Sequence, residues 1–346
     1  MEFEHIVLDA QTPGTLNDVC LIADLDGDGH NDVIVGGKLG ERNVVWYEYP
    51  DWKRHTIGTA RFEAGGVTVD ITGNGRLDLV AGNDWGGNEL YWFENPGSPG
   101  QEWPRRLIEN GLYKYHNQAV GDVDGDGEDE IVVLSQQSRV VVYYDIPSDP
   151  RVSPWPKECR HTICEDVEVE GVAVADLDND GEMEIVAGPY WFKREGGVWR
   201  RRPIAPGFRL TCVAVGDLDG DGGLEVVLSE GESHPARLAW FSGFPDWQMH
   251  VLREDLFHPH SLGVADFNGD GLLDIFVGEM GLGKNESPRL LVYVNRGDGA
   301  FEEVLIDDRH ATHDAKAGVL GGGRLPSIVG KPYQPGRQVD LWLNKS

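Results

Sequence analysis

The sequence predicts an all-β protein, a seven-bladed β-propeller with four-stranded antiparallel blades. An acidic segment recurs six times, beginning at residues 24, 70, 122, 176, 217 and 266. Each copy lies between two short apolar runs and is followed by an aromatic run and a fourth strand-like run. Glycine accounts for 46 of 346 residues, about 13% against an average near 7%, which is typical of many tight turns. Four short strands in about 50 residues is the period of a propeller blade.

The acidic segment is predicted to be the turn between the first two strands of each blade. In the first copy, acids stand at positions 1, 3, 5 and 9, with Gly29 at position 6. Five copies supply these candidate cation ligands: Asp24, Asp26, Asp28 and Asp32; Asp122, Asp124, Asp126 and Glu130; Asp176, Asp178, Asp180 and Glu184; Asp217, Asp219, Asp221 and Glu225; and Asp266, Asn268, Asp270 and Asp274. The copy at residues 70–78 has Thr72 and Asn74 in place of two acids and adds Arg76.

The seventh blade is predicted to be shared between the two ends of the chain. Residues 319–330 match the repeat without its acids, and the aromatic run around Trp342 comes next, near the C-terminus. The missing fourth strand matches residues 4–8. We therefore expect the N-terminal strand to close the last blade and remove the open sheet edges. Residues 1–346 then form one domain.

Composition excludes two classes of partner. The chain has 30 basic and 59 acidic residues and a formal net charge of −29, so we expect it to bind neither nucleic acid nor an anionic membrane surface. No apolar run approaches the roughly 20 residues needed to cross a bilayer. As written, the sequence predicts a soluble cytoplasmic protein, or an extracellular one if a signal peptide has been removed. Cys20 and Cys212 lie in apolar runs and are expected to be buried and reduced.

Alternating carboxylates with glycine at position 6 follow the spacing of an EF-hand loop. Oxygen ligands favour Ca²⁺ or Mg²⁺, so up to six loops are expected to hold a structural cation. Solvated turn acids are the alternative. The loop at residues 70–78 is the one expected to be empty. These DxDxDG-xx-[DE] turns resemble the FG-GAP or VCBS repeat family, and the resemblance implies a calcium-binding propeller without specifying its function.

The face opposite the acidic turns holds the candidate functional residues. The positions six residues before each acidic turn are expected to converge on the axis. They are Asp18, Ala64, His116, Glu170, Thr211, His260 and His313. Imidazoles with a carboxylate suit Zn²⁺ or another transition metal, with Glu170 as a ligand. Histidines that line the channel without a metal are the alternative. By contrast, the histidines of the fourth strands, among them His55 and His161, are expected to be structural.

The first functional hypothesis is a carbohydrate lyase or dehydratase that acts by β-elimination on a keto-sugar or uronate. This reaction needs a base, an acid and a group that neutralises the polarised carbonyl or carboxylate. The candidate catalytic residues are His116, His260, His313, Tyr190, Tyr333, Arg209 and Lys331. The propeller is similar to that of aldos-2-ulose dehydratases and, more distantly, of polysaccharide lyases. The second hypothesis is a non-catalytic, cation-stabilised propeller that binds a protein or glycan. The expected ligand is a small sugar or glycan, and no oligomeric state is predicted.

Overall fold

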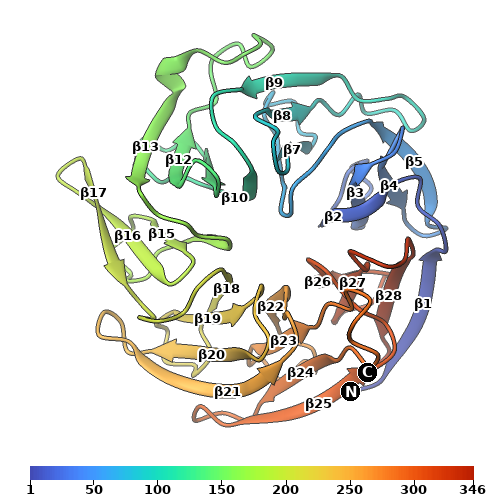
Figure 1. The fold of residues 1–346 in the computed structure, drawn as a ribbon, viewed down its shortest axis with the longest axis vertical. Helices are drawn as coiled ribbons and strands as arrows, with labels where there is room; N and C mark the ends of the chain where they lie inside the picture. Colours follow the sequence, from blue (N-terminus) through green and yellow to red (C-terminus); the bar gives the residue numbers. More distant parts are fainter.

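The computed structural model describes residues 1–346 as seven four-stranded antiparallel sheets arranged around a central axis (Figure 1). The first four blades are β2 (Thr15–Ala23), β3 (Asp32–Leu39), β4 (Val44–Glu48) and β5 (Lys53–Gly58); β6 (Val67–Val69), β7 (Asp78–Gly82), β8 (Leu90–Phe93) and β9 (Arg105–Glu109); β10 (Tyr115–Gly121), β11 (Glu130–Ser135), β12 (Val140–Tyr144) and β13 (Arg160–Glu165); and β14 (Val172–Ala175), β15 (Glu184–Ala187), β16 (Tyr190–Glu195) and β17 (Val198–Pro203). This architecture confirms the predicted fold.

The remaining three blades complete the ring. Their strands are β18 (Thr211–Gly216), β19 (Glu225–Glu230), β20 (Ala236–Ser242) and β21 (Gln248–Leu256); β22 (Ser261–Ala265), β23 (Asp274–Gly278), β24 (Leu290–Asn295) and β25 (Phe301–Asp307); and β26 (Lys316–Val319), β27 (Pro326–Gly330) and β28 (Val339–Asn344) with β1 (Phe3–Asp9). In every blade the first strand lies nearest the axis and the fourth strand forms the rim (Figure 1).

The N-terminal strand closes the last blade, as predicted. β1 pairs antiparallel with β28, and in this register Phe3 lies opposite Asn344 and Ile6 lies opposite Leu341. The two ends of the chain therefore lie side by side (Figure 1). The main-chain hydrogen bonds of this pair close the ring of blades, and β1 supplies the fourth strand of the last blade.

The core lies between neighbouring blades. Second strands are buried on both faces, which explains continuous apolar runs such as Val33, Ile34 and Val35. The aromatic third strands pack across the blade boundaries. For example, one apolar cluster joins Trp46 of β4 with Tyr91 of β8.

Asparagines after or at the end of the third strand connect adjacent blades. The Asn95 side-chain amide donates to the carbonyl of Leu25 at 2.8 Å, and that of Asn295 donates to the carbonyl of Leu218 at 2.6 Å. Each carbonyl belongs to the acidic turn of the preceding blade. These hydrogen bonds fix the turns relative to the blade that follows them.

The outer-strand histidines have packing roles. His55 stacks on Trp46 and His250 stacks on Trp240, with ring centroids 4.6 and 4.0 Å apart. His161 stacks on Tyr143 in the same way. The four cysteines are free. The one helix is the three-residue 3-10 turn η1 (Lys157–Cys159), so the chain has no helix long and apolar enough to cross a membrane.

Candidate functional site

Four acidic turns each bring three carboxylates close enough to hold a cation. These groups are Asp24, Asp26 and Asp32; Asp122, Asp124 and Glu130; Asp176, Asp178 and Glu184; and Asp217, Asp219 and Glu225. Within each group the ligand atoms all lie within 4.8 Å of one another. They come from positions 1, 3 and 9. The fourth predicted ligands, Asp28, Asp126, Asp180 and Asp221, lie outside these groups; instead, each accepts the backbone N–H two residues later.

The position-1 and position-9 carboxylates also shape the turn. The two oxygens of Asp122 accept the backbone N–H groups of Gly125 and Gly127 at 2.8 and 3.0 Å. Glu130 accepts the N–H of Val123 at 2.8 Å. Asp124 differs, because its Oδ1 is buried without a hydrogen-bond partner. Burial, with three other acids nearby, raises the pKa of Glu130 to about 7. A cation at this position would offset that concentration of negative charge.

The acidic turn at residues 176–184 already contains a cation that the chain itself supplies. The Lys193 ammonium lies 2.6 Å from Asp178, 2.6 Å from Asp180 and 2.8 Å from Glu184. Lys193 projects from β16, the third strand of the same blade. Two of its contacts, Asp178 and Glu184, belong to the three carboxylates that would otherwise hold a divalent ion.

The two remaining turns, at residues 70–78 and 266–274, do not form a three-ligand group. In the turn at residues 266–274, the Asn268 amide donates to Asp270 at 2.9 Å. In the turn at residues 70–78, the Arg76 side chain leaves the loop and donates to the carbonyl of Asn95. The structure therefore offers four acidic groups for the six cations predicted as an upper limit, and Lys193 fills one of the four.

The opposite face carries the loops between second and third strands and the connections that enter each first strand. We call it the mouth face. All seven predicted ring residues are buried there, at 0–4% exposure. They lie in or just before the first strands of seven different blades, so the side chains come together only at the axis.

Three ring residues form an axial His–Glu–His group. His116 Nε2 lies 3.0 Å and His260 Nε2 lies 2.9 Å from the same oxygen, Oε1 of Glu170. Two ligands of a tetrahedral zinc ion, each about 2 Å from the metal, are roughly 3.3 Å apart. The observed spacings are only slightly shorter, so these three side chains could hold a metal with a small movement.

The two nitrogens of His116 both face acceptors. Nδ1 lies 3.2 Å from the backbone carbonyl oxygen of Glu170, while Nε2 faces its carboxylate. A neutral imidazole has one N–H and can satisfy only one of them. A cation between Nε2 and Glu170 would satisfy the second contact. This arrangement is typical of metal sites, in which a ligating histidine donates its other N–H to a backbone carbonyl.

Several buried polar atoms around this group have no hydrogen-bond partner. They include Oε2 of Glu170, Nδ1 of His260 and Oγ1 of Thr211. Such atoms are rare in native proteins because each costs about 1–3 kcal/mol. The axis therefore has unused capacity to bind an ion, a water molecule or a ligand.

Charges within the axial group favour the ionised forms. Burial opposes the charge on Glu170, but the two histidines beside it hold its pKa well below the usual range. Burial likewise disfavours the imidazolium of His260, yet the hydrogen bond to Glu170 raises the pKa of His260 to about 9. The carboxylate is thus available as an anionic ligand at neutral pH, and His260 would release its Nε2 proton on binding a metal.

His313 and Lys331 extend the axial group. The His313 ring stacks on His260, with centroids 4.4 Å apart. Lys331 Nζ lies 3.2 Å from Nδ1 of His313 and 3.0 Å from the carbonyl of Asp18. Burial lowers the pKa of Lys331, and burial together with Lys331 lowers the pKa of His313. Both groups are therefore shifted toward their neutral, basic forms.

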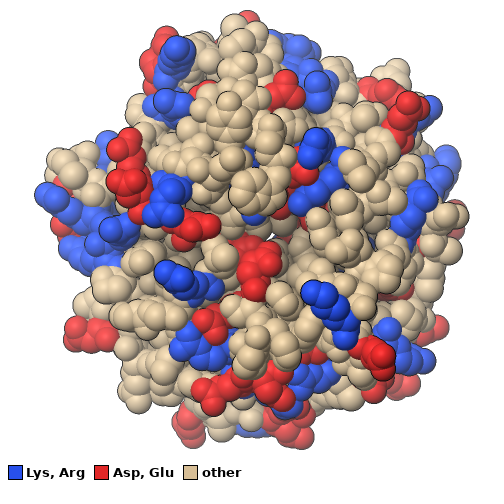
Figure 2. Space-filling view, viewed as in Figure 1, with Lys and Arg blue, Asp and Glu red and all other residues tan.

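Tyr333 lies at the more exposed edge of this group. Its ring centroid is 5.1 Å from that of His313, and the Lys38 ammonium lies 5.2 Å from it. Lys38 in turn pairs with Asp18 at 2.7 Å and with Glu63 at 3.3 Å. Burial raises the pKa of Tyr333, which keeps the phenol protonated. On the face drawn in Figure 2, acidic side chains lie beside the central opening.

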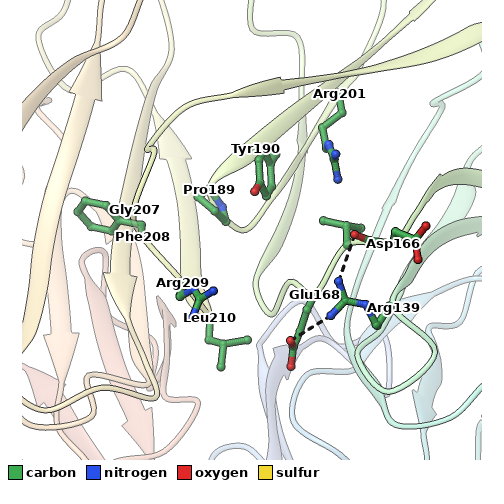
Figure 3. Close-up of a pocket in the computed structure, with 11 residues that line it drawn as sticks. Arg139, Asp166, Glu168, Pro189, Tyr190, Arg201, Gly207, Phe208, Arg209 and Leu210 are labelled. Carbon is green, nitrogen blue, oxygen red and sulfur yellow. Dashed lines mark hydrogen bonds and ion pairs between the residues drawn. The ribbon is translucent and has the colours of Figure 1, made fainter.

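The two other predicted catalytic residues, Tyr190 and Arg209, lie in a separate pocket (Figure 3). Its volume is about 430 Å³, and Arg139 and Arg201 also line it. Tyr190 and Arg209 were predicted to lie at the axial mouth with the histidines, whereas in the structure they line this separate pocket. Arg139 and Arg201 were not predicted, because they come from other segments and carry no local motif.

Comparison with known proteins supports the repeat assignment. The model of the FG-GAP-like repeat matches residues 24–81, 70–133, 122–187 and 217–277, together more than half of the chain. The chain belongs to the FG-GAP-like repeat family. A search of curated proteins found no match.

Solved structures share the propeller fold at low sequence identity. They include rhamnogalacturonan lyase YesW (15% identity, TM-score 0.55, covering 99% of this chain and 76% of that one), BBS1N in complex with ARL6DN (12%, 0.59, 99% and 96%) and the V. cholerae biofilm matrix protein Bap1 (10%, 0.53, 97% and 88%). At these identities the likeness concerns the fold alone. FG-GAP-like repeats therefore account for the blades and the acidic turns, and function has to be argued from the mouth face.

Proposed function

We propose that this FG-GAP-like propeller is a carbohydrate-active lyase or dehydratase that acts by β-elimination on a keto-sugar or uronate at the mouth. The observation that carries the proposal is the buried axial group, in which His116, Glu170 and His260 meet beside His313 and Lys331. Concentrating this many titratable groups at one mouth is typical of a functional site.

The axial residues offer each part of a β-elimination. A metal ion held by His116, Glu170 and His260 would polarise the substrate carbonyl or carboxylate as a Lewis acid. His313 and Lys331 are the candidates for the base that takes the α-proton, because both are shifted toward their neutral forms.

Tyr333 suits the role of general acid. As the carbon–hydrogen bond breaks, its electrons form the new double bond and the bond from the β-carbon to oxygen breaks. The departing oxygen then needs a proton. Tyr333 holds one at neutral pH and is the more exposed member of the axial group, so it can meet the sugar directly.

A non-catalytic binding propeller is the second candidate. Two observations favour it: the axial side chains are almost fully buried, and propellers such as BBS1N and Bap1 match this fold as well as the lyase does. In that case the His–Glu–His group would hold the blades together around the axis, and the rim of the mouth would meet a protein or glycan.

An absorbance assay separates the two candidates. Purified protein would be incubated with polygalacturonate, rhamnogalacturonan or 1,5-anhydrofructose, with Zn²⁺, Mn²⁺ or Ca²⁺ added. We expect ultraviolet absorbance from a new conjugated double bond with at least one substrate. Glu170→Gln should lower kcat/KM by about 100-fold or more, and the outer-strand control His161→Ala should leave it unchanged. If no substrate gains absorbance, the lyase proposal is wrong.

A further inference from the structure

Three arginines converge on the pocket of Figure 3 from different segments. Arg139 comes from the loop before β12, Arg201 from β17 and Arg209 from the connection that enters β18. The pocket therefore lies on the mouth face between neighbouring blades. No single stretch of sequence predicts it, because the three arginines line one pocket only after the blades have packed.

Two of these guanidinium groups have no carboxylate partner. Arg139 pairs with Glu168 at 3.4 Å, but Arg201 and Arg209 make no ion pair in a chain of net charge −29. Arg201 has only a weak contact with the sulfur of Cys164 at 3.8 Å. Unpaired guanidinium groups around a cavity attract an anion, and their planar donors match a carboxylate in a bidentate manner.

The carboxylates of Asp166 and Glu168 also line the pocket, and Glu168 pairs with Arg139. Other lining residues provide surfaces for a sugar ring. The Arg201 guanidinium lies 5.2 Å from the ring centroid of Tyr190, and Pro189 and Phe208 form further walls. The volume of about 430 Å³ falls within the roughly 300–1,000 Å³ of small-molecule sites. The combination of apolar walls and fixed cationic groups suits one charged sugar better than a bare inorganic ion.

Two segments of the chain run from the pocket lining to the axial ring. Glu168 lines the pocket, and Glu170 of the axial group follows two residues later. Leu210 lines it as well, and the next residue is Thr211 of the ring. A saccharide that places one unit in the pocket could therefore continue toward the axial group.

We infer that this pocket is a subsite for the carboxylate of a hexuronate, held by Arg201 and Arg209 against the Tyr190 ring. The inference rests on the proposed function in that the adjoining sugar would react at the axis. It narrows the substrate class from keto-sugars or uronates to saccharides that carry a hexuronate. Arg201 and Arg209 would then determine specificity without taking part in the elimination.

Binding of a single sugar tests the inference without any turnover. Calorimetric titration would compare galacturonate with its methyl ester, which has the same ring and no charge. We expect galacturonate to bind at least about 10-fold more tightly. Arg201→Met and Arg209→Met should each remove this preference. Arg200→Met, on the same strand but outside the pocket, should retain it.

Two results would overturn the inference. One is equal affinity for the ester and the acid; the other is an acid preference that survives both pocket substitutions. Inorganic phosphate added as a competitor provides a third arm: if phosphate binds and galacturonate does not displace it, the site is an anion site of another kind. Loss of acid binding in the two variants supports the subsite even where no unsaturated product forms, in which case the lyase proposal fails alone.

Discussion

The ammonium of Lys193 lies 2.8 Å from the buried carboxylate of Glu184, in the acidic turn at residues 176–184. Asp178 and Asp180 complete its contacts at 2.6 Å each. These hydrogen-bonded carboxylates raise the pKa of Lys193 despite the burial of its ammonium. One of the four three-carboxylate groups thus has a lysine ammonium in the place of a divalent ion.

Replacing Lys193 should convert this turn into a calcium-dependent one. With Lys193→Met, three carboxylates lose their counter-charge, so the free energy of unfolding in chelator should fall by about 2 kcal/mol. Titration calorimetry should then detect one Ca²⁺ site more than in the unmodified protein. Lys53→Met, an exposed lysine without an ion pair, serves as the control. An unchanged number of calcium sites in Lys193→Met would contradict this interpretation.

The acidic turns at residues 24–32, 122–130 and 217–225 should make the stability of the unmodified protein dependent on divalent cations. Chelation is expected to lower the melting temperature, and added Ca²⁺ should restore it, because a ligand that binds only the folded state stabilises it. Scanning calorimetry at several calcium concentrations measures this effect. A melting temperature that does not change with calcium would favour the alternative of solvated turn acids.

Two substitutions in the turn at residues 122–130 should distinguish the stability that a bound cation provides from the stability that the hydrogen bonds of the turn provide. Asp124→Asn removes a charge from an oxygen without a hydrogen-bond partner, so it should reduce stability only when Ca²⁺ is present. Asp122→Ala removes the acceptor of two backbone N–H groups, so it should cost about 1–3 kcal/mol even in chelator. Denaturant unfolding with and without calcium compares them. Equal losses in both conditions for both variants would show that the turn binds no cation.

Asp307 should contribute stability that is lost in acid. Burial raises its pKa, but Trp342, the backbone N–H of Arg309 and His310 outweigh burial and hold the pKa at about 2. An unfolded chain has a value near 3.9. Because the folded pKa is lower, the contribution is present above about pH 4 and disappears as the pH falls through about 2. Asp307→Asn should therefore lose about 2 kcal/mol at pH 6 and show a flatter acid limb in denaturant unfolding.

The exposed neighbour Asp308 provides the control for this experiment. Asp308→Asn should leave the free energy of unfolding at pH 6 within about 0.5 kcal/mol of the unmodified value. If Asp307→Asn shows the same acid limb as Asp308→Asn, then Asp307 does not couple stability to pH in this range.

Local chemistry was sufficient to predict most of the fold. The spacing of the acids around Gly29, and its five further copies, defined the turns and the strands beside them. The match of residues 4–8 to a fourth strand gave the closure through β1. Equivalent positions in successive blades also predicted that His116, Glu170 and His260 meet, because a propeller brings such positions to one axis.

The sequence did not predict contacts that depend on how neighbouring strands cross. Lys193 lies nine residues after Glu184, on the third strand, and its approach to the turn follows from the path of that strand. Likewise, Arg139, Arg201 and Arg209 come to line one pocket only when the blades pack together. For the same reason Tyr190 and Arg209 were assigned to the axis, although they line the neighbouring pocket.

The axial group should bind about one transition-metal ion per chain. Elemental analysis after exposure to Zn²⁺ and removal of weakly bound ions would measure it. His260→Ala should release the metal because it removes one of three ligands, while His250→Ala, on an outer strand, should retain it. Metal content that is the same in both variants would place the ion elsewhere.

The masses of the products show whether the protein is a lyase that acts by β-elimination. β-Elimination within tetragalacturonate would divide it into fragments whose masses sum to that of the substrate, and one fragment would carry the new double bond. We expect such fragments from the unmodified protein with metal added and none from Glu170→Gln. Fragments that together gain the mass of one water molecule would show hydrolysis instead, and an intact tetrasaccharide in every condition would contradict a lyase that acts on uronates.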